Sequence, residues 1–124
     1  MVTPDELLDA AAALAAGDRE VDWRNATSRA YYAAFHRCRL VAAAEGIPEA
    51  GTQSAHASLI DGLTYHRNPP TLRGLGFMLK QCRTKRVVAD YEIGAGFDRD
   101  VAHTVLADSR RIFDRSAGLV RLTQ

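Results

Sequence analysis

The stretch of sequence that decides the fold runs from Asp22 to Gly46 and reads DWRNATSRAYYAAFHRCRLVAAAEG. It predicts one long helix, because the Asp22 carboxylate can cap the first turn and Gly46 can enter the left-handed region at the end without steric cost. At 100° per residue its apolar residues fall on one broad arc. They are Trp23, Ala30, Tyr31, Ala34, Phe35, Cys38, Val41 and Ala42. The arc predicts a helix at the centre of a helical core.

A second stripe lies on the opposite side of this helix. Its members are spaced i, i+4, i+7 and i+11, and they are Asn25, Arg29, Tyr32 and His36. The stripe is polar and aromatic, but Ala33 and Leu40 lie beside it, so it does not have the composition of a plain solvated face. We expect the functional residues on this stripe.

The segments on both sides of residues 22–46 also carry helix signals. Thr3-Pro4-Asp5-Glu6 is a capping box that starts a first helix, and Gly17 stops it. The short turn that follows predicts that the first two helices are antiparallel neighbours. After a loop, Ser54 or Thr52 can cap a third helix that runs to about Tyr65.

Two further helices are expected in the second half of the chain. Asn68-Pro69-Pro70 breaks the chain, and a fourth helix follows from about Thr71 to Val88. Asp98 can cap a last helix that continues towards Val120. No alternating pattern predicts a strand. The expected fold is all-α, an up-and-down helical bundle of four to five helices that forms a single domain over residues 1–124.

Composition excludes several classes of protein. The formal net charge is +1, so no global field draws the chain to nucleic acid or to a membrane. Fourteen of the sixteen basic residues are Arg, which suits phosphate binding but is also typical of an Arg- and Ala-rich composition from a GC-rich genome. The sequence has no membrane span and does not begin like a signal peptide, and Cys38 and Cys82 are expected to be free thiols. We expect a cytoplasmic protein.

Three motifs resemble the HEPN family of small helical domains. They are SRAYYAAFH from Ser28 to His36, a histidine entering the third helix (His56), and Ala89-Asp90-Tyr91 preceded by Lys85-Arg86. The first motif is specific, and the order and spacing of the other two add to it. The resemblance covers about Asp5 to Phe113.

The resemblance implies a function. Many HEPN proteins resemble metal-independent RNases, often toxins encoded beside an antitoxin that is frequently a minimal nucleotidyltransferase. The catalytic signature of the family is an Arg followed, after four to six residues, by a His, and only Arg29 and His36 match it here. A polar residue usually follows that Arg, whereas this sequence has Ala30. The resemblance also implies a homodimer, with the active site where two motif helices meet.

The chemistry of these residue types fits RNA cleavage. Arg29 and His36 share one helix face with their Cα atoms about 10.5 Å apart along the axis, so a phosphodiester can lie between them. A histidine can take the proton of a 2′-hydroxyl, and a guanidinium can stabilise the phosphate as it becomes pentacovalent. Tyr32 can stack on a base, and Asn25 can orient a substrate oxygen. The leading prediction is a toxin-type endoribonuclease acting on single-stranded RNA.

Alternatives remain open at this stage. The stripe can be a dimer seam in which Arg29 pairs with a carboxylate such as Asp90 and His36 is a buried, hydrogen-bonded histidine. The chain can be a non-catalytic RNA- or nucleotide-binding module that partners a nucleotidyltransferase antitoxin, or a purely structural dimerisation domain. We expect secondary or structural roles for four residues: His56, Arg86, Asp90 and Tyr91. The last two are expected to fix the loop after the fourth helix. No residues have metal-ligand spacing, and no cofactor is expected.

Overall fold

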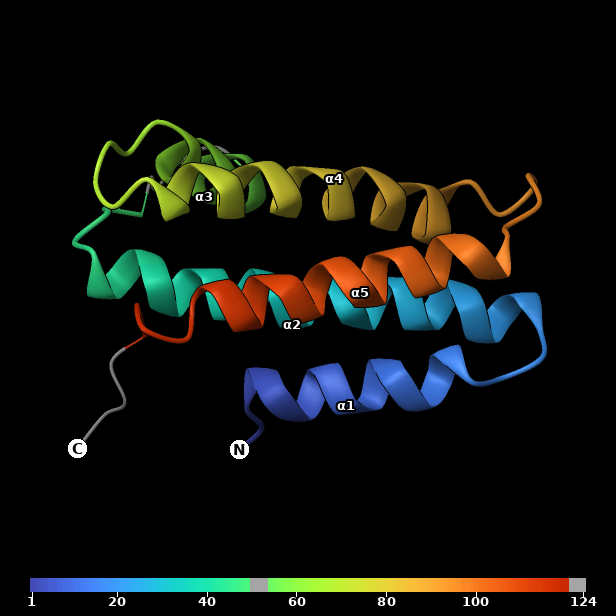
Figure 1. Ribbon diagram of the computed structural model, residues 1–124. Helices are drawn as coiled ribbons and strands as arrows, with labels where there is room; N and C mark the ends of the chain where they lie inside the picture. The colour runs from blue at the N-terminus through green and yellow to red at the C-terminus, as the bar shows by residue number, and fades with distance from the viewer. Residues whose placement is uncertain (50–53, 121–124) are drawn as a thin grey trace.

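The computed structural model describes residues 1–49 and 54–120, and within them the chain forms five helices and no strand (Figure 1). The helices are α1 (Pro4–Ala15), α2 (Glu20–Ala44), α3 (Ala55–Thr64), α4 (Thr71–Tyr91) and α5 (Arg99–Arg115). They pack as a compact bundle, which confirms the all-α prediction. None of the described helices is long and apolar enough to cross a bilayer.

The bundle has three layers, and α2 with α5 forms the middle one (Figure 1). On one side α1 packs against both middle helices, and on the other side α3 and α4 form the outer layer. Helix α2 contacts all four other helices, as expected for the helix that the sequence places at the centre. Helices α1 and α2 run antiparallel, as predicted from their short connection.

The caps that the sequence predicts are mostly where expected. Thr3 and Glu6 form the capping box of α1, with hydrogen bonds of 2.9 and 3.1 Å. Gly46 has a φ of 73° directly after the C-cap of α2, a conformation that favours glycine. The Asp22 prediction was wrong: α2 starts at Glu20, and Asp22 occupies the third helical position. From there its carboxylate accepts the backbone N–H of Arg19 at 3.2 Å.

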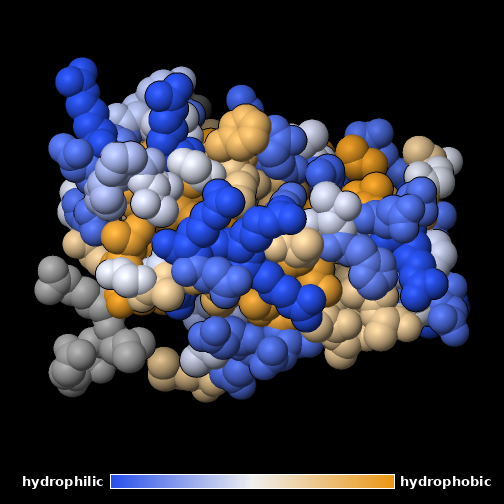
Figure 2. All heavy atoms as spheres, in the orientation of Figure 1, coloured by the Kyte–Doolittle hydropathy of each residue, from blue (hydrophilic) through white to orange (hydrophobic). Residues whose placement is uncertain are grey.

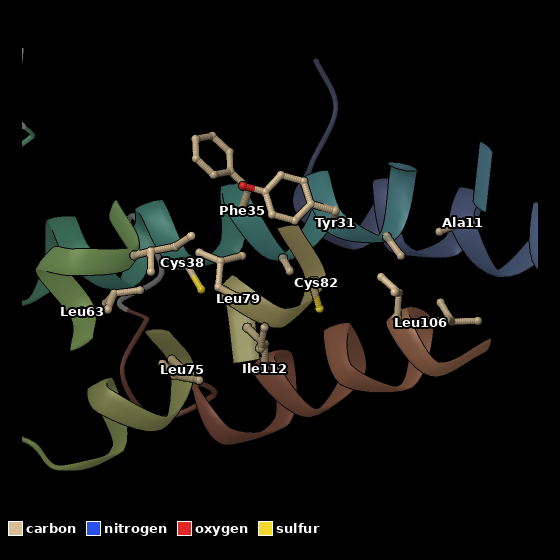
Figure 3. Close-up of a cluster of buried hydrophobic side chains, with 14 of the residues drawn as sticks. Ala11, Tyr31, Phe35, Cys38, Leu63, Leu75, Leu79, Cys82, Leu106 and Ile112 are labelled. Atoms are coloured by element: carbon tan, nitrogen blue, oxygen red, sulfur yellow. The ribbon is translucent and has the colours of Figure 1, made fainter. Parts of the chain in front are cut away.

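The apolar arc of α2 forms the core. Its alanines let neighbouring backbones approach, and Ala26, Ala30 and Ala34 have no exposed surface. Side chains from α4 and α5 meet this arc in Figure 3, where Cys38 of α2 lies near Leu79, Cys82 and Ile112. Both cysteines are free and buried, and burial raises their thiol pKa values to about 12.

Two arginines of α2 cap other helices, which explains part of the Arg-rich composition. Arg24 is buried and donates to the carbonyl oxygens of Ala89 at 2.9 Å and Glu92 at 3.2 Å, at the end of α4. Arg37 donates to the Ser116 hydroxyl at 2.9 Å, at the end of α5. The last carbonyl groups of a helix have no partner within it, so Arg24 supplies donors at the end of α4, while Arg37 ties the end of α5 to α2.

The outer layer shows one close approach. Ser54 caps α3, while the alternative cap Thr52 lies outside the described residues. A Cβ atom at Gly76 would lie 2.8 Å from the backbone nitrogen of Thr64, so only glycine lets α4 pass α3 at this distance.

The boundaries of two predicted helices were wrong. Helix α4 continues to Tyr91 and not only to Val88, so Asp90 and Tyr91 belong to its last turn and not to the loop after it. The capping by Arg24 explains the longer helix, because it satisfies the final carbonyl groups. Helix α5 starts at its predicted cap, Asp98, but ends at Arg115 and not near Val120.

Candidate functional site

Five side chains from three helices meet at the polar and aromatic stripe of α2. They are Arg29, Tyr32 and His36 of α2, His56 of α3 and Arg86 of α4, and we call them the arginine–histidine cluster. All five were singled out from the sequence as catalytic, binding or secondary residues. The long-range contacts among them could not be predicted from helical spacing.

Tyr32 is the common neighbour of the cluster. The guanidinium carbons of Arg29 and Arg86 lie 5.1 and 5.4 Å from the centre of its ring. The ring centres of His36 and His56 lie 6.5 and 5.9 Å away. Cations over an aromatic face are attracted by its quadrupole, so Tyr32 can hold two arginines close together although their charges repel. Its half-buried ring therefore organises the cluster more than the sequence suggested.

His56 is held by α2. Its Nδ1 lies 2.5 Å from the hydroxyl of Tyr31, and its ring packs against Phe35 at a tilt of 33° with 4.5 Å between the ring centres. Burial raises the pKa of Tyr31, so the phenol keeps its proton and can donate it in this hydrogen bond. Burial, together with the charges of Arg86 and Arg83, lowers the pKa of His56. A neutral His56 that accepts at Nδ1 carries its proton on Nε2, as a donor.

His36 is half-buried and its pKa is also lowered, first by burial and then by the charges of Arg39 and Arg29. Its ring contacts Tyr32 and Phe35, and no hydrogen bond to it is found within the described part of the chain. The imidazole is therefore neutral near pH 7 and able to accept a proton. These contacts differ from the buried, hydrogen-bonded histidine of the dimer-seam alternative.

Arg86 is the buried cation of the cluster. Its side chain pairs with the Asp90 carboxylate at 3.4 Å, and the same carboxylate accepts the Ser28 hydroxyl at 3.3 Å. Its Nε is buried and has no hydrogen-bond partner, which leaves a donor of a buried cation unused. Asp90 thus pairs with Arg86, whereas the exposed Arg29 contacts Ser28 at 3.4 Å.

Two predicted site residues lie at the margin of the cluster. Asn25 is exposed one turn before Arg29, so the structure leaves it on the stripe but does not bring it against the other side chains. Tyr91 is 73% exposed, and its ring centre lies 6.0 Å from the guanidinium carbon of Arg86.

Ala30 faces away from the cluster. It has no exposed surface, and its carbonyl oxygen accepts the Ser109 hydroxyl of α5 at 2.6 Å. The position after Arg29 therefore belongs to the interface of α2 with α5. A polar side chain there would enter the core and not the site.

Sequence reasoning missed two arginines near the cluster. Arg83 of α4 donates to the Ser54 hydroxyl at 3.3 Å and acts electrostatically on His56. Arg39 of α2 pairs with Glu49 at 3.0 Å and acts on His36. Helical periodicity alone gives no signal for Arg83, because its relation to α2 depends on how α3 and α4 pack.

The charge of the site suits an anion. Four arginines act on or belong to the cluster, and two of them are paired with carboxylates: Arg86 with Asp90 and Arg39 with Glu49. Within residues 1–49 and 54–120 no group of three or more His, Cys, Asp or Glu side chains could hold a metal ion. Guanidinium groups beside an aromatic ring and neutral imidazoles provide what a phosphate and a base require.

Comparison with models of protein families, with curated proteins and with solved structures finds no match in any of the three. The resemblance to HEPN domains therefore stays an expectation from the motif residues.

Proposed function

We propose that this protein is a HEPN-like, up-and-down helical bundle that cleaves single-stranded RNA without a metal, as a toxin-type endoribonuclease. The observation that carries the proposal is that Arg29, one turn before Tyr32, and His36, one turn after it, both lie against the Tyr32 ring, and that burial and nearby cations keep the imidazole neutral. The proposed site is completed at the interface of a homodimer. A nucleotidyltransferase antitoxin is the proposed protein partner, and the cytoplasm the proposed location.

The proposed reaction needs few groups. His36 takes the proton of the 2′-hydroxyl, and the 2′-oxygen attacks the adjacent phosphorus. Arg29 stabilises the pentacovalent phosphate through its guanidinium group, which forms hydrogen bonds to two oxygens at once. The bond to the 5′-oxygen breaks, that oxygen takes up a proton from water, and the protonated His36 returns its proton to the hydroxide that this leaves. The products are a 2′,3′-cyclic phosphate and a 5′-hydroxyl. Tyr32 holds Arg29 in place and offers a ring edge to a base.

The test is cleavage of single-stranded RNA by purified protein in the presence of EDTA. We expect His36→Ala to reduce the rate at least a hundredfold, the typical contribution of a general base, with a nearly unchanged melting temperature. The matched control is His103→Ala, because His103 is exposed on α5 and far along the chain from the cluster. Unfolding or dissociation of His36→Ala, with His103→Ala intact, would assign His36 a structural role.

A second candidate is a non-catalytic module that binds RNA or a nucleotide beside a nucleotidyltransferase. It is favoured by the absence of a group that orients His36 within the described residues, since general bases are commonly held by a hydrogen bond. In that case wild-type protein leaves RNA intact, yet binds a nucleotide with an affinity that Arg29→Ala lowers.

A further inference from the structure

Basic residues are concentrated in one element of the fold. Between residues 62 and 89 the sequence has six Lys or Arg and no Asp or Glu, although the whole chain has 16 and 15 of them. The six are Arg67, Arg73, Lys80, Arg83, Lys85 and Arg86. Five of them belong to α4, which is therefore a strongly basic helix in a protein whose net charge is only +1.

The outer face of α4 is a continuous exposed stripe. Its members recur at helical spacing, and they are Arg73, Phe77, Lys80, Thr84, Val87 and Tyr91. All are exposed, Phe77 to 61% and Tyr91 to 73%. The rise of the helix from Arg73 to Tyr91 gives this α4 stripe a length of about 27 Å. Along the edge over α3 and α4, Figure 2 shows long hydrophilic side chains interrupted by hydrophobic atoms.

One end of the α4 stripe continues into the turn between α3 and α4. Arg73 lines a hollow there together with Arg67 and Tyr65. The Tyr65 side chain is 79% exposed and contributes little to the core. This end therefore adds the ring of Tyr65 and the cation of Arg67 to the α4 stripe.

The other side of the stripe leads to the arginine–histidine cluster. Lys80 and Arg83 line a groove between α3 and α4. The Arg83 guanidinium also donates to the hydroxyl of Ser54, two residues before His56. Asp61 and Glu92 line the same groove and both are exposed, whereas the outer face of α4 between Arg73 and Val87 carries no carboxylate. A chain of phosphates is thus favoured on the outer face.

This combination of groups selects a ligand. The cations on the outer face of α4 attract a phosphate backbone, because no Asp or Glu lies on that face between Arg73 and Val87. Exposed rings offer stacking surfaces that only unpaired bases can use. An acidic protein would use the cations but would gain little from the rings. We propose that the α4 stripe binds a single strand of RNA, with phosphates at Arg73 and Lys80 and a base on Phe77, and leads it past Arg83 to the cluster. This inference rests on the proposed RNA cleavage for the identity of the strand.

Binding is measured by fluorescence anisotropy with a labelled oligouridylate whose 2′-hydroxyls are methylated, since it cannot be cleaved. We expect Arg73→Ala with Lys80→Ala to weaken binding at least tenfold and to reduce the slope of log K against log salt by about 1.4, or about 0.7 per lost phosphate contact. Phe77→Ala should weaken binding about fivefold or more. The matched control is Arg99→Ala with Arg110→Ala, because both are exposed on α5 and remove the same charge.

The outcomes separate this inference from the proposed cleavage. The inference would be overturned if the α4 and α5 double variants lost the same amount of binding affinity. It would also be overturned if the wild type did not bind at low salt, or if Phe77→Ala left binding unchanged. Polyglutamate bound as tightly as the oligonucleotide would assign the stripe to an acidic protein instead. If the wild type binds the methylated strand through α4 but leaves ordinary RNA intact, cleavage fails and this inference stands. If RNA is cleaved equally well by the α4 pair and the wild type, this inference fails alone.

Discussion

The lowered pKa of His36 gives a prediction at the scale of single residues. A general base must be neutral, so the rate should rise as the pH increases through the pKa of His36 and level off above it. Because burial, Arg39 and Arg29 lower this pKa, we expect the midpoint below 6.5. Arg39→Ala should move the midpoint upward, since it removes one of the positive charges that oppose protonation. The pH–rate profile measures both, with Arg110→Ala as the control that should not move the midpoint.

The same shifts affect folding. Both His36 and His56 have pKa values below that of a free histidine, so the unfolded chain binds more protons than the folded one. Their contribution therefore makes the protein less stable as the pH falls from about 6.5, through the range between the unfolded and the folded pKa values. Thermal unfolding at pH 5 and 7 checks the sign, and the difference should shrink in His36→Gln with His56→Gln.

Ala30 gives a prediction that reverses the simplest expectation from the motif. Restoring the polar residue of the family pattern with Ala30→Asn would place an amide in the closed interface with α5, next to the Ser109 hydrogen bond. Overpacking and burial of a polar group each cost about 1–3 kcal/mol, so we expect a loss of about 2 kcal/mol or more. Denaturant unfolding measures it, and Ala13→Asn on an exposed part of α1 should cost under about 1 kcal/mol. A stable Ala30→Asn protein would contradict this account.

At the scale of elements, the sequence predicted what depends on neighbours in the chain. The capping box at Thr3, the cap at Asp98 and the left-handed Gly46 are local, and all were found where expected. The end of α4 was wrong because it depends on Arg24, more than sixty residues away. In the same way, the stripe of α2 could be drawn from periodicity, whereas the position of Arg86 against Tyr32 needed the packing of α4 on α2.

The prediction at the scale of elements concerns Arg24, which joins α2 to the end of α4. Removing its guanidinium takes the donor from the Ala89 carbonyl and one of two donors from the Glu92 carbonyl. It also removes the cation that lies 5.1 Å from the ring centre of Phe97. Charged hydrogen bonds contribute about 1.5–3 kcal/mol each, with losses that overlap. We expect Arg24→Ala to lower the free energy of unfolding by about 3 kcal/mol, measured in urea. Arg99→Ala on the exposed part of α5 is the control, and an equal effect of both would show that net charge and not capping is responsible.

The charge of the whole molecule is close to balanced, yet its distribution is not. From a net charge of +1 we expected that no field draws the chain to nucleic acid. The net charge hides the basic α4, because acidic residues before and after it in the sequence cancel its charge. Two arginines, Arg24 and Arg37, are used inside the fold and so do not contribute a phosphate-binding surface. Counting charges from composition cannot separate these uses, since burial decides between them.

The last prediction concerns assembly. Leu40 is 46% exposed on the same side of α2 as His36, and it lines a hollow with Leu7 and Ala43 that no described residue fills. Two-fold pairing through α2 would bury this apolar surface and bring two copies of Arg29 and His36 together. We expect light scattering at micromolar concentration to give twice the chain mass of 13.6 kDa. Leu40→Glu should yield the monomer and lose cleavage, because buried like charges oppose pairing, whereas Ile93→Glu, at a 75% exposed position after α4, should stay dimeric and active. A monomeric wild type that cleaves RNA would remove the shared site and leave His36 and Arg29 to act within one chain.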